Sequence, residues 1–382
     1  MRSVVFPAFR VAAMVLALGG TPAVAQETIT LKVAHPLPET HYSWELGIKK
    51  MLDSITEATD GRVQFEVYPA NQLGRDAYGL LRSGIADMAM IVPLYAPDKF
   101  PLTGVTEFSS FYDTTCEAAE KYWELARPGG ALDAAEYGAQ GLRVVFAMTT
   151  APQRYMTSSK PVASLGDAGG LKIYAAGSAL PRALRAVGSI PISITASELY
   201  DSVSRGTVDG ALFPYSSTNA YKLGGKLGHE VGGVKFGVSS WFVGMSESRF
   251  AALPEDVQQA ITAAGLPVQQ SFCAWTDEDD ENIRQSLIAS GELTVSELPE
   301  AEVQLWRERL LKAAQEWAAE MDAAGKNGTE LLEAMAQALG IGRDRRPQGA
   351  RDTMPRNAGA RSPYRGWRPA RHGGRMPSAS EV

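Results

Sequence analysis

Hydrophobic and polar residues follow one another along the chain in an order that predicts alternating strands and helices. Residues 28–34 and 63–67 alternate between apolar and polar side chains, as half-buried strands do. Residues 43–59 between them carry apolar side chains at the period of a helix. The sequence of strand, helix and strand with short connections indicates a parallel α/β unit.

The same kinds of pattern recur in the second half of the chain and predict a second unit. Thr195 and Glu198 form a capping box at a helix start, and Pro254 opens a long acidic helix. The chain leaves the first unit, builds the second and returns, and two such crossings suit a hinge. The further elements expected are strands at 142–146, 153–157, 171–174, 190–194 and 240–245, and helices at 178–187 and within 300–339.

Two distant segments, residues 78–89 and 200–211, repeat one pattern of Tyr, Gly and Asp at the same spacing. Each predicts a helix that ends at a glycine, followed by a short apolar strand. We expect the aspartates, Asp87 and Asp209, to cap local backbone amides. Two similar α/β lobes would place their strand ends at a shared crevice, where open α/β sheets bind ligands. The fold class expected is therefore two-lobed α/β.

The N-terminus predicts export. Arg2 and Arg10 precede the short apolar run 11–18, and Ala23 to Ala25 has the small residues of a cleavage site. Residues 1–25 are therefore interpreted as a signal peptide, and the mature protein is expected to be periplasmic. The apolar run is too short to span a bilayer, and no later stretch reaches the roughly 20 apolar residues that a membrane-spanning helix needs.

Charge is unevenly distributed over a chain whose formal net charge is −6. The tail 343–382 is rich in Arg, Pro and Gly, so we expect it to be disordered; a basic arm that touches anionic lipid is the alternative. The remaining body is acidic, which argues against nucleic-acid binding. Cys116 and Cys273 are expected to be two unpaired, buried thiols, although export would permit a disulfide.

Several short motifs resemble the solute-binding proteins of TRAP transporters, the DctP-like family. They are Gly170 to Ile173, Val208-Asp209-Gly210 followed by Pro214, Tyr68 to Gly74 and Leu253 to Asp256. The resemblance implies a periplasmic-binding-protein-like fold with a hinge and a long helix, from Pro254 to about Ser290, that spans both lobes. It also implies a receptor that closes over a small organic acid and delivers it to a sodium-driven membrane permease. The lobes expected are 29–151 plus 240–279 for lobe I, and 152–239 plus 280–342 for lobe II.

The resemblance also assigns ligand-binding residues. An arginine usually follows the Leu-Lys-Ile strand of the family and clamps the ligand carboxylate, but Tyr174 stands there in this chain. A second family arginine matches Arg154, the expected anion contact. Phe213 takes a position that is usually asparagine. Together with Tyr215 and Trp241, these aromatic residues would form a pocket for an aromatic or hydrophobic acid, or else pack in the sheet core.

Four further residues are weaker candidates for the ligand site. Asn219 lies one helical step beyond Tyr215, and His35 and His41 flank a proline-rich loop at the end of a strand. Arg75 follows a turn in the first lobe. For each of them, a solvated surface side chain is the alternative interpretation.

An enzyme is the rival class, and the sequence gives it little support. The chain has four histidines and no His-Glu-x-x-His, Cys-x-x-Cys, Gly-x-Ser-x-Gly or Walker motif. We therefore expect no catalytic residue, no metal site and no cofactor. A periplasmic enzyme and a ligand-sensing receptor are the alternatives to a transport receptor.

Overall fold

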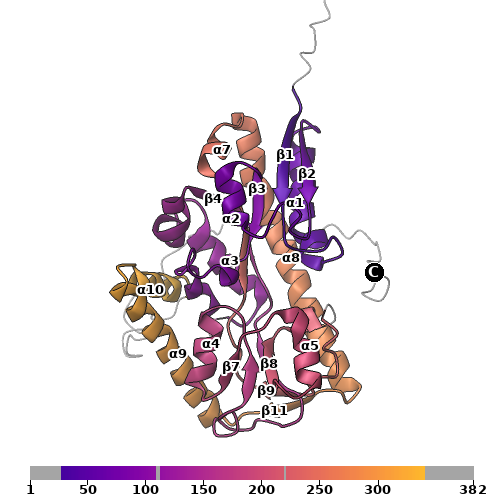
Figure 1. Ribbon diagram of the computed structural model, residues 1–382, viewed down its shortest axis with the longest axis vertical. Helices are drawn as coiled ribbons and strands as arrows, with labels where there is room; N and C mark the ends of the chain where they lie inside the picture. Colours follow the sequence, from indigo (N-terminus) through magenta and orange to yellow (C-terminus); the bar gives the residue numbers. More distant parts are fainter. Residues whose placement is uncertain (1–26, 109–111, 219–220, 340–382) are drawn as a thin grey trace, which may run out of the picture.

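The computed structural model describes residues 27–108, 112–218 and 221–339. The predicted signal peptide, the predicted tail 343–382 and Asn219 lie outside these residues. Two β-sheets lie toward opposite ends of an elongated molecule, and helices pack against both (Figure 1). This arrangement confirms the predicted two-lobed α/β fold. No helix in the described ranges is both long and apolar enough to cross a membrane.

Lobe I is built on a five-stranded sheet with the strand order β2-β1-β3-β10-β4. β1 pairs in parallel with β2 and β3, whereas β10 returns from later in the chain and runs antiparallel to β3 and β4. Its strands are β1 (Ile29–Ala34), β2 (Val63–Tyr68), β3 (Met88–Ile91), β4 (Leu142–Thr149) and β10 (Ser240–Ser246). Its helices and helical turns are η1 (Ser43–Ile48), α1 (Lys49–Ala58), α2 (Ala77–Ser83), η2 (Pro93–Tyr95), η3 (Thr103–Glu107), α3 (Thr115–Ala126), η4 (Asp133–Tyr137), η5 (Gly138–Gln140) and α7 (Glu247–Ala251).

Lobe II is built on a six-stranded sheet with the order β11-β9-β5-β8-β6-β7. β6 pairs in parallel with β7 and β8, and β5 runs antiparallel to β8 and β9. The predicted capping box is present at the start of α5, where the Thr195 amide donates to the Glu198 carboxylate over 2.8 Å. The elements are β5 (Arg154–Thr157), β6 (Lys172–Tyr174), α4 (Ala179–Ala186), β7 (Ile190–Ile192), α5 (Ala196–Ser204), β8 (Gly210–Phe213), α6 (Tyr215–Thr218), β9 (His229–Gly232) and β11 (Thr294–Glu297).

The repeated Tyr-Gly-Asp pattern forms the same structure in both lobes. Gly84 and Gly206 adopt left-handed conformations, with φ of 71° and 68°, at the two helix ends. The expectation that the aspartates cap local amides is wrong, because each one reaches the neighbouring parallel strand. Asp87 accepts a hydrogen bond from the Lys32 amide, and Asp209 accepts one from the Lys172 amide, both over 2.8 Å. The repeat therefore fixes strand pairing.

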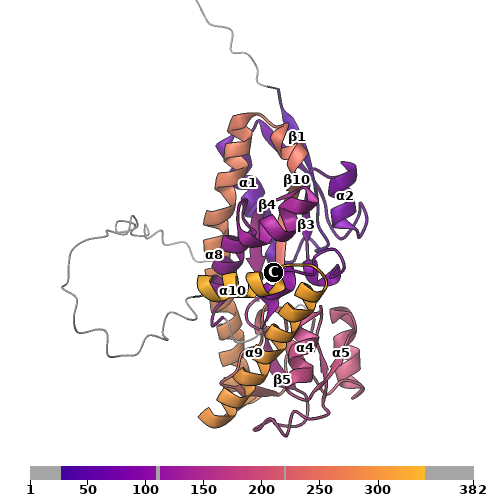
Figure 2. The ribbon, with the colours of Figure 1, turned by 90° about the vertical axis from the view of Figure 1, so that its left-hand side faces the viewer.

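The helix α8 (Glu255–Ala289) spans both lobes, as predicted, with Pro254 at its N-cap and Ser290 at its C-cap. Its first half, including Ile261 and Phe272, packs in the core of lobe I, whereas Ile283 packs against lobe II. Figure 2 shows α8 running along one side of the whole molecule.

A second helix also bridges the lobes, which the sequence analysis did not anticipate. Trp306 of α9 (Glu300–Ala323) is buried in lobe II, whereas Trp317, three turns later, is buried in lobe I. α9 crosses the molecule diagonally toward α10 (Gly328–Ala338) (Figure 2). The predicted lobe boundaries stay a prediction, but the second half of α9 and α10 pack on lobe I.

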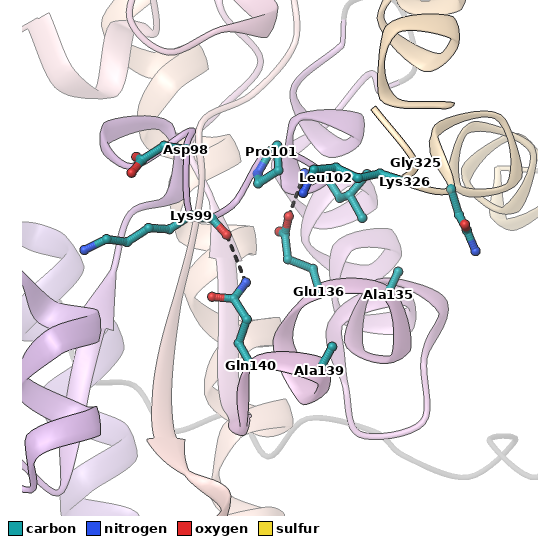
Figure 3. A pocket seen from close by; sticks show the side chains of 11 residues that line it. Asp98, Lys99, Pro101, Leu102, Ala135, Glu136, Ala139, Gln140, Gly325 and Lys326 are labelled. Atoms are coloured by element: carbon teal, nitrogen blue, oxygen red, sulfur yellow. Dashed lines mark hydrogen bonds between the residues drawn. The ribbon is translucent and has the colours of Figure 1, made fainter. Parts of the chain in front are cut away.

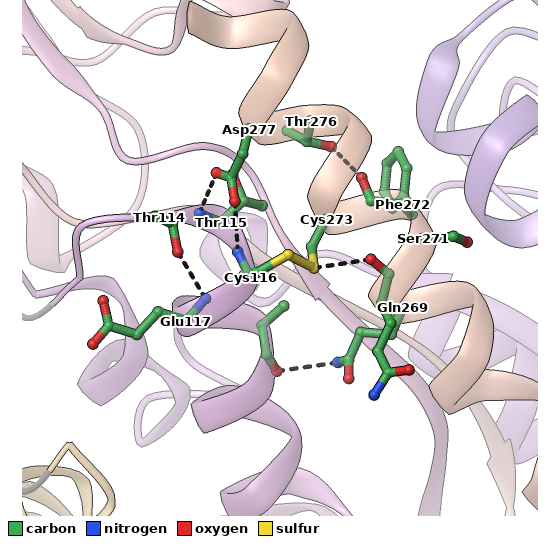
Figure 4. The surroundings of a disulfide bond; sticks show 12 residues. Thr114, Thr115, Cys116, Glu117, Gln269, Ser271, Phe272, Cys273, Thr276 and Asp277 are labelled. Atoms are coloured by element: carbon green, nitrogen blue, oxygen red, sulfur yellow. Dashed lines mark hydrogen bonds between the residues drawn. A yellow bond between two sulfur atoms is a disulfide. The ribbon is translucent and has the colours of Figure 1, made fainter. Parts of the chain in front are cut away.

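The two cysteines form a disulfide, so the expectation of unpaired thiols is wrong. Cys116 of α3 and Cys273 of α8 are bonded, with their Cα atoms 4.8 Å apart (Figure 4). One turn further along α8, the Asp277 carboxylate accepts hydrogen bonds from the amides of Thr115 and Cys116. The start of α3 is thus held against α8 covalently and by charge-assisted hydrogen bonds.

Candidate functional site

Arg154, the predicted anion contact, lies in a buried cluster of charges between the lobe II sheet and α8. Its side chain is 13% exposed and pairs with Glu230 of β9 over 3.5 Å and with Asp280 of α8 over 3.8 Å. Arg284 and the Tyr215 hydroxyl also donate to Glu230, over 2.7 and 2.9 Å. The positive charge of Arg154 is therefore already offset by two carboxylates.

At neutral pH, Arg154 remains paired with ionised carboxylates of this cluster. Burial raises the pKa of Asp280 to about 6, while the Ser216 amide and Arg154 counteract that rise. Asp280 is therefore mostly ionised near pH 7. The Nε atom of Arg154 is buried and has no hydrogen-bond partner among the residues that the structure describes. The Nε–H group of Arg154 is therefore an unused donor.

Aromatic side chains gather where lobe II faces lobe I. Tyr174 at the end of β6 and Phe213 at the end of β8 have ring centroids 6.2 Å apart, and Phe213 packs edge-on against Tyr221 at 5.6 Å. Tyr95 of η2 belongs to lobe I, and its neighbour Leu94 lies beside Gly177, on the loop that follows Tyr174. These four residues form what we call the cleft aromatic cluster.

The three tyrosines of the cleft aromatic cluster are neutral hydrogen-bonding groups, and Phe213 is apolar. Burial is the main cause that raises the pKa of Tyr174 and Tyr221 above the ordinary tyrosine value. Tyr174 and Phe213 are buried, whereas Tyr95 is 71% exposed. The cluster therefore offers an apolar wall with phenol groups that can donate to a ligand.

The two lobes also meet on the α8 side of the molecule. The Tyr42 hydroxyl of lobe I lies 3.2 Å from the Ser217 hydroxyl of α6, and the Tyr42 ring contacts Trp275 of α8 with centroids 5.4 Å apart. His41 precedes this contact and uses its Nδ1 to accept a hydrogen bond from the Ser43 amide. His41 therefore supports the turn into η1.

His35 lies at the end of β1, as predicted, but it is buried rather than part of a solvated loop. Its side chain is stacked on Trp44 with ring centroids 4.3 Å apart. Burial is the largest cause that lowers the pKa of His35 to about 4, so the ring is neutral at pH 7. Neither ring nitrogen has a hydrogen-bond partner within the described ranges.

The other predicted residues lie apart from the cleft aromatic cluster or outside the description. Trp241 is buried in the lobe I core, where it contacts Phe146 and Phe272. Arg75 is an exposed residue beside the N-cap of α2. Asn219 is outside the described residues. Tyr215 packs in the same hydrophobic core as Tyr174 and Phe213, and its hydroxyl donates to Glu230 of the charge cluster.

A cavity beside η4 and η5 contains none of the predicted ligand residues. It has a volume of about 440 Å³ and lies between η4, η5 and the turn that joins α9 to α10 (Figure 3). The buried Glu136 carboxylate beside it already accepts hydrogen bonds from the Leu102 and Thr103 amides. The buried carboxylate that borders this cavity is thus already used to hold the backbone in place. A smaller cavity of about 280 Å³ borders Arg154 together with Lys235 and Arg307.

Sequence reasoning missed three residues that belong to the candidate site: Tyr95, Tyr221 and Glu107. Tyr95 follows shortly after β3, and strand ends are where ligand contacts of α/β lobes gather, so that signal was available. Tyr221 lies in an irregular segment and Glu107 ends the short helical turn η3, so no periodic pattern indicates their orientation.

The chain is similar to known solute-binding proteins over most of its length. Residues 33–320 match the family model described as bacterial extracellular solute-binding protein, family 7. A solute-binding protein of Roseobacter denitrificans is 27% identical over 67% of this chain and 78% of its own. The C4-dicarboxylate-binding periplasmic protein DctP of Rhodobacter capsulatus is 27% identical over 80% of this chain and 91% of its own.

Solved structures agree with this assignment. A TRAP periplasmic solute-binding protein of Bordetella bronchiseptica, with bound (R)- and (S)-mandelate, has a TM-score of 0.69 and 27% identity. That match covers 82% of this chain and 99% of the other. A TRAP solute-binding protein of Rhodoferax ferrireducens in complex with benzoate shares the fold, with a TM-score of 0.70, 23% identity and coverages of 82% and 98%. The chain therefore belongs to family 7 of the bacterial extracellular solute-binding proteins, the DctP-type solute receptors of TRAP transporters.

Proposed function

We propose that this protein is a periplasmic receptor that captures a small carboxylic acid with an aromatic or hydrophobic body between its lobes. It then delivers that acid to a TRAP membrane permease. The cleft aromatic cluster carries the proposal, because Tyr174 stands where the resemblance places the usual carboxylate-clamping arginine. The apolar rings around it favour an apolar ligand body over a second carboxylate.

The charge cluster around Arg154 points to the same class of ligand. A free arginine attracts anions strongly, but Arg154 shares its charge with Glu230 and Asp280. A second ligand carboxylate would therefore compete with Glu230 and Asp280 for Arg154. One carboxylate needs only the unused Arg154 donor and neutral phenol groups.

The test is a binding screen of the purified protein by thermal shift and calorimetry. Benzoate, phenylacetate and mandelate are compared with malonate and succinate, and each ligand is recovered afterwards to check for turnover. A ligand at one hundred times its dissociation constant should add about 2.7 kcal/mol to the free energy of unfolding. Tighter binding of the dicarboxylates would refute the proposed ligand class, and consumption of any ligand would favour an enzyme.

A substitution at Tyr174 tests the specificity argument directly. Tyr174→Arg restores the clamp implied by the family resemblance, so we expect improved binding of malonate or succinate and weaker binding of aromatic acids. Tyr174→Phe is the matched control, because it keeps the ring and should keep the aromatic preference. Delivery is tested by ligand uptake into vesicles that contain the membrane subunits of the transporter.

A further inference from the structure

The side chain of Glu107 is buried with one carboxyl oxygen that lacks a hydrogen-bond partner among the described residues, and the proposed function does not account for it. Glu107 ends η3 in lobe I, is 2% exposed, and its Oε1 atom has no hydrogen-bond partner in the described part of the chain. Burial raises the pKa of Glu107 to about 8, while a hydrogen bond from the Ser240 amide opposes that rise. A buried carboxyl oxygen without a partner is costly, and native proteins retain few of them.

The position of Glu107 places this carboxyl group at the seam between the lobes. A Cβ atom added at Gly177 would lie 3.3 Å from Glu107 Oε2 and 3.0 Å from Leu94 Cβ. Gly177 belongs to lobe II and follows Tyr174 by three residues, on the loop after β6. The carboxyl group of lobe I therefore faces the loop that carries the ligand position of lobe II.

The cleft aromatic cluster lies next to the same group. Leu94, which directly precedes Tyr95, and Glu107 lie beside the same residue, Gly177, and Gly177 follows Tyr174 by three residues. An acid whose ring packs against Tyr174 and Tyr95 would therefore have Glu107 within its immediate surroundings. A hydroxyl group on that acid would supply the partner that Glu107 Oε1 lacks.

We propose that Glu107 is a specificity residue, which selects hydroxy acids over the corresponding acids without a hydroxyl group. This inference rests on the proposed function, since it assumes a carboxylic acid beside the cleft aromatic cluster. A neutral donor suits Glu107 because its burial opposes ionisation, and the protonated carboxyl group can both donate to and accept from a hydroxyl. An ammonium group would instead require the ionised carboxylate.

The experiment compares matched ligand pairs by calorimetry at pH 7 on the full mature protein. Mandelate is paired with phenylacetate, and 3-hydroxybenzoate with benzoate. We expect at least one hydroxylated compound to bind about five- to tenfold tighter than its partner, the worth of one neutral hydrogen bond. Equal affinities within both pairs would overturn the inference, as would tighter binding of phenylglycine than of mandelate.

Two substitutions test whether Glu107 causes this preference. In Glu107→Leu, both members of each ligand pair should bind with about equal affinity. Glu107→Gln should retain most of the preference for the hydroxylated acid, because its amide oxygen still accepts a hydrogen bond. Glu136→Gln is the control, a second buried glutamate of lobe I away from the cleft aromatic cluster, and it should leave the preference unchanged. A preference that persists in Glu107→Leu overturns the role of Glu107. Failure of every acid to bind the wild type would instead refute the proposed function itself.

Discussion

Removal of Arg154 is expected to destabilise the protein strongly, because Arg154 neutralises two buried carboxylates. At an effective dielectric constant of about 20, its attraction to Glu230 over 3.5 Å and to Asp280 over 3.8 Å amounts to about 4–5 kcal/mol each before desolvation is subtracted. Breaking a buried ion pair on one side costs about 3–5 kcal/mol in measured cases. We therefore expect Arg154→Ala to lower the free energy of unfolding by about 3–5 kcal/mol.

Most of the lost stability should arise because Asp280 is left as a buried charge without a cationic partner. Glu230 keeps Arg284 and the Tyr215 hydroxyl after the substitution, whereas Asp280 keeps only neutral partners such as the Ser216 amide. Asp280→Asn in the Arg154→Ala background should therefore recover part of the loss, about 1–2 kcal/mol, as a coupled pair does in a double-mutant cycle.

Urea unfolding followed by tryptophan fluorescence measures both effects. Arg307→Ala is the matched control, since Arg307 borders the same cavity as Arg154 but is exposed, and it should change the stability by less than about 0.5 kcal/mol. A loss below about 1 kcal/mol in Arg154→Ala, without rescue by the Asp280 substitution, would show that the cluster is not an energetic unit.

Three further outcomes follow from the structure. Reduction of the Cys116–Cys273 disulfide, which closes a loop of sequence separation 157, should cost about 3–5 kcal/mol in urea unfolding; two titratable thiols in the untreated protein would contradict the bond. Because the pKa of Glu107 rises from 4.5 to about 8 on folding, unfolding releases its proton between these values, so stability falls as pH rises through this window. The full effect is at most about 5 kcal/mol, and Glu107→Gln should flatten the slope; an unchanged slope would assign it to other groups. Gly237→Ala should destabilise by more than about 2 kcal/mol, because its Cβ would lie 1.7 Å from the Glu107 carbonyl oxygen, whereas Gly224→Ala meets nothing within 4 Å and serves as the neutral control in the same assay.

Local patterns in the sequence were sufficient for the architecture. Alternating apolar residues located β1 and β2, the capping box located the start of α5, and Pro254 located the start of α8. These signals are local, because burial of one face of a strand or helix imposes a short period on the residues that form it. The family resemblance added the position of Tyr174, which lies in the cleft aromatic cluster.

Only the tertiary structure decided how distant residues share their charges and bonds. It joined Cys116 to Cys273, directed Asp87 and Asp209 to neighbouring strands, and gave Arg154 its two carboxylate partners. No periodic pattern records such contacts, because the residues come from elements that meet only when the lobes and the two bridging helices have packed. The sequence therefore determined the two lobes and the position of Tyr174, and long-range packing determined which charged groups pair with one another.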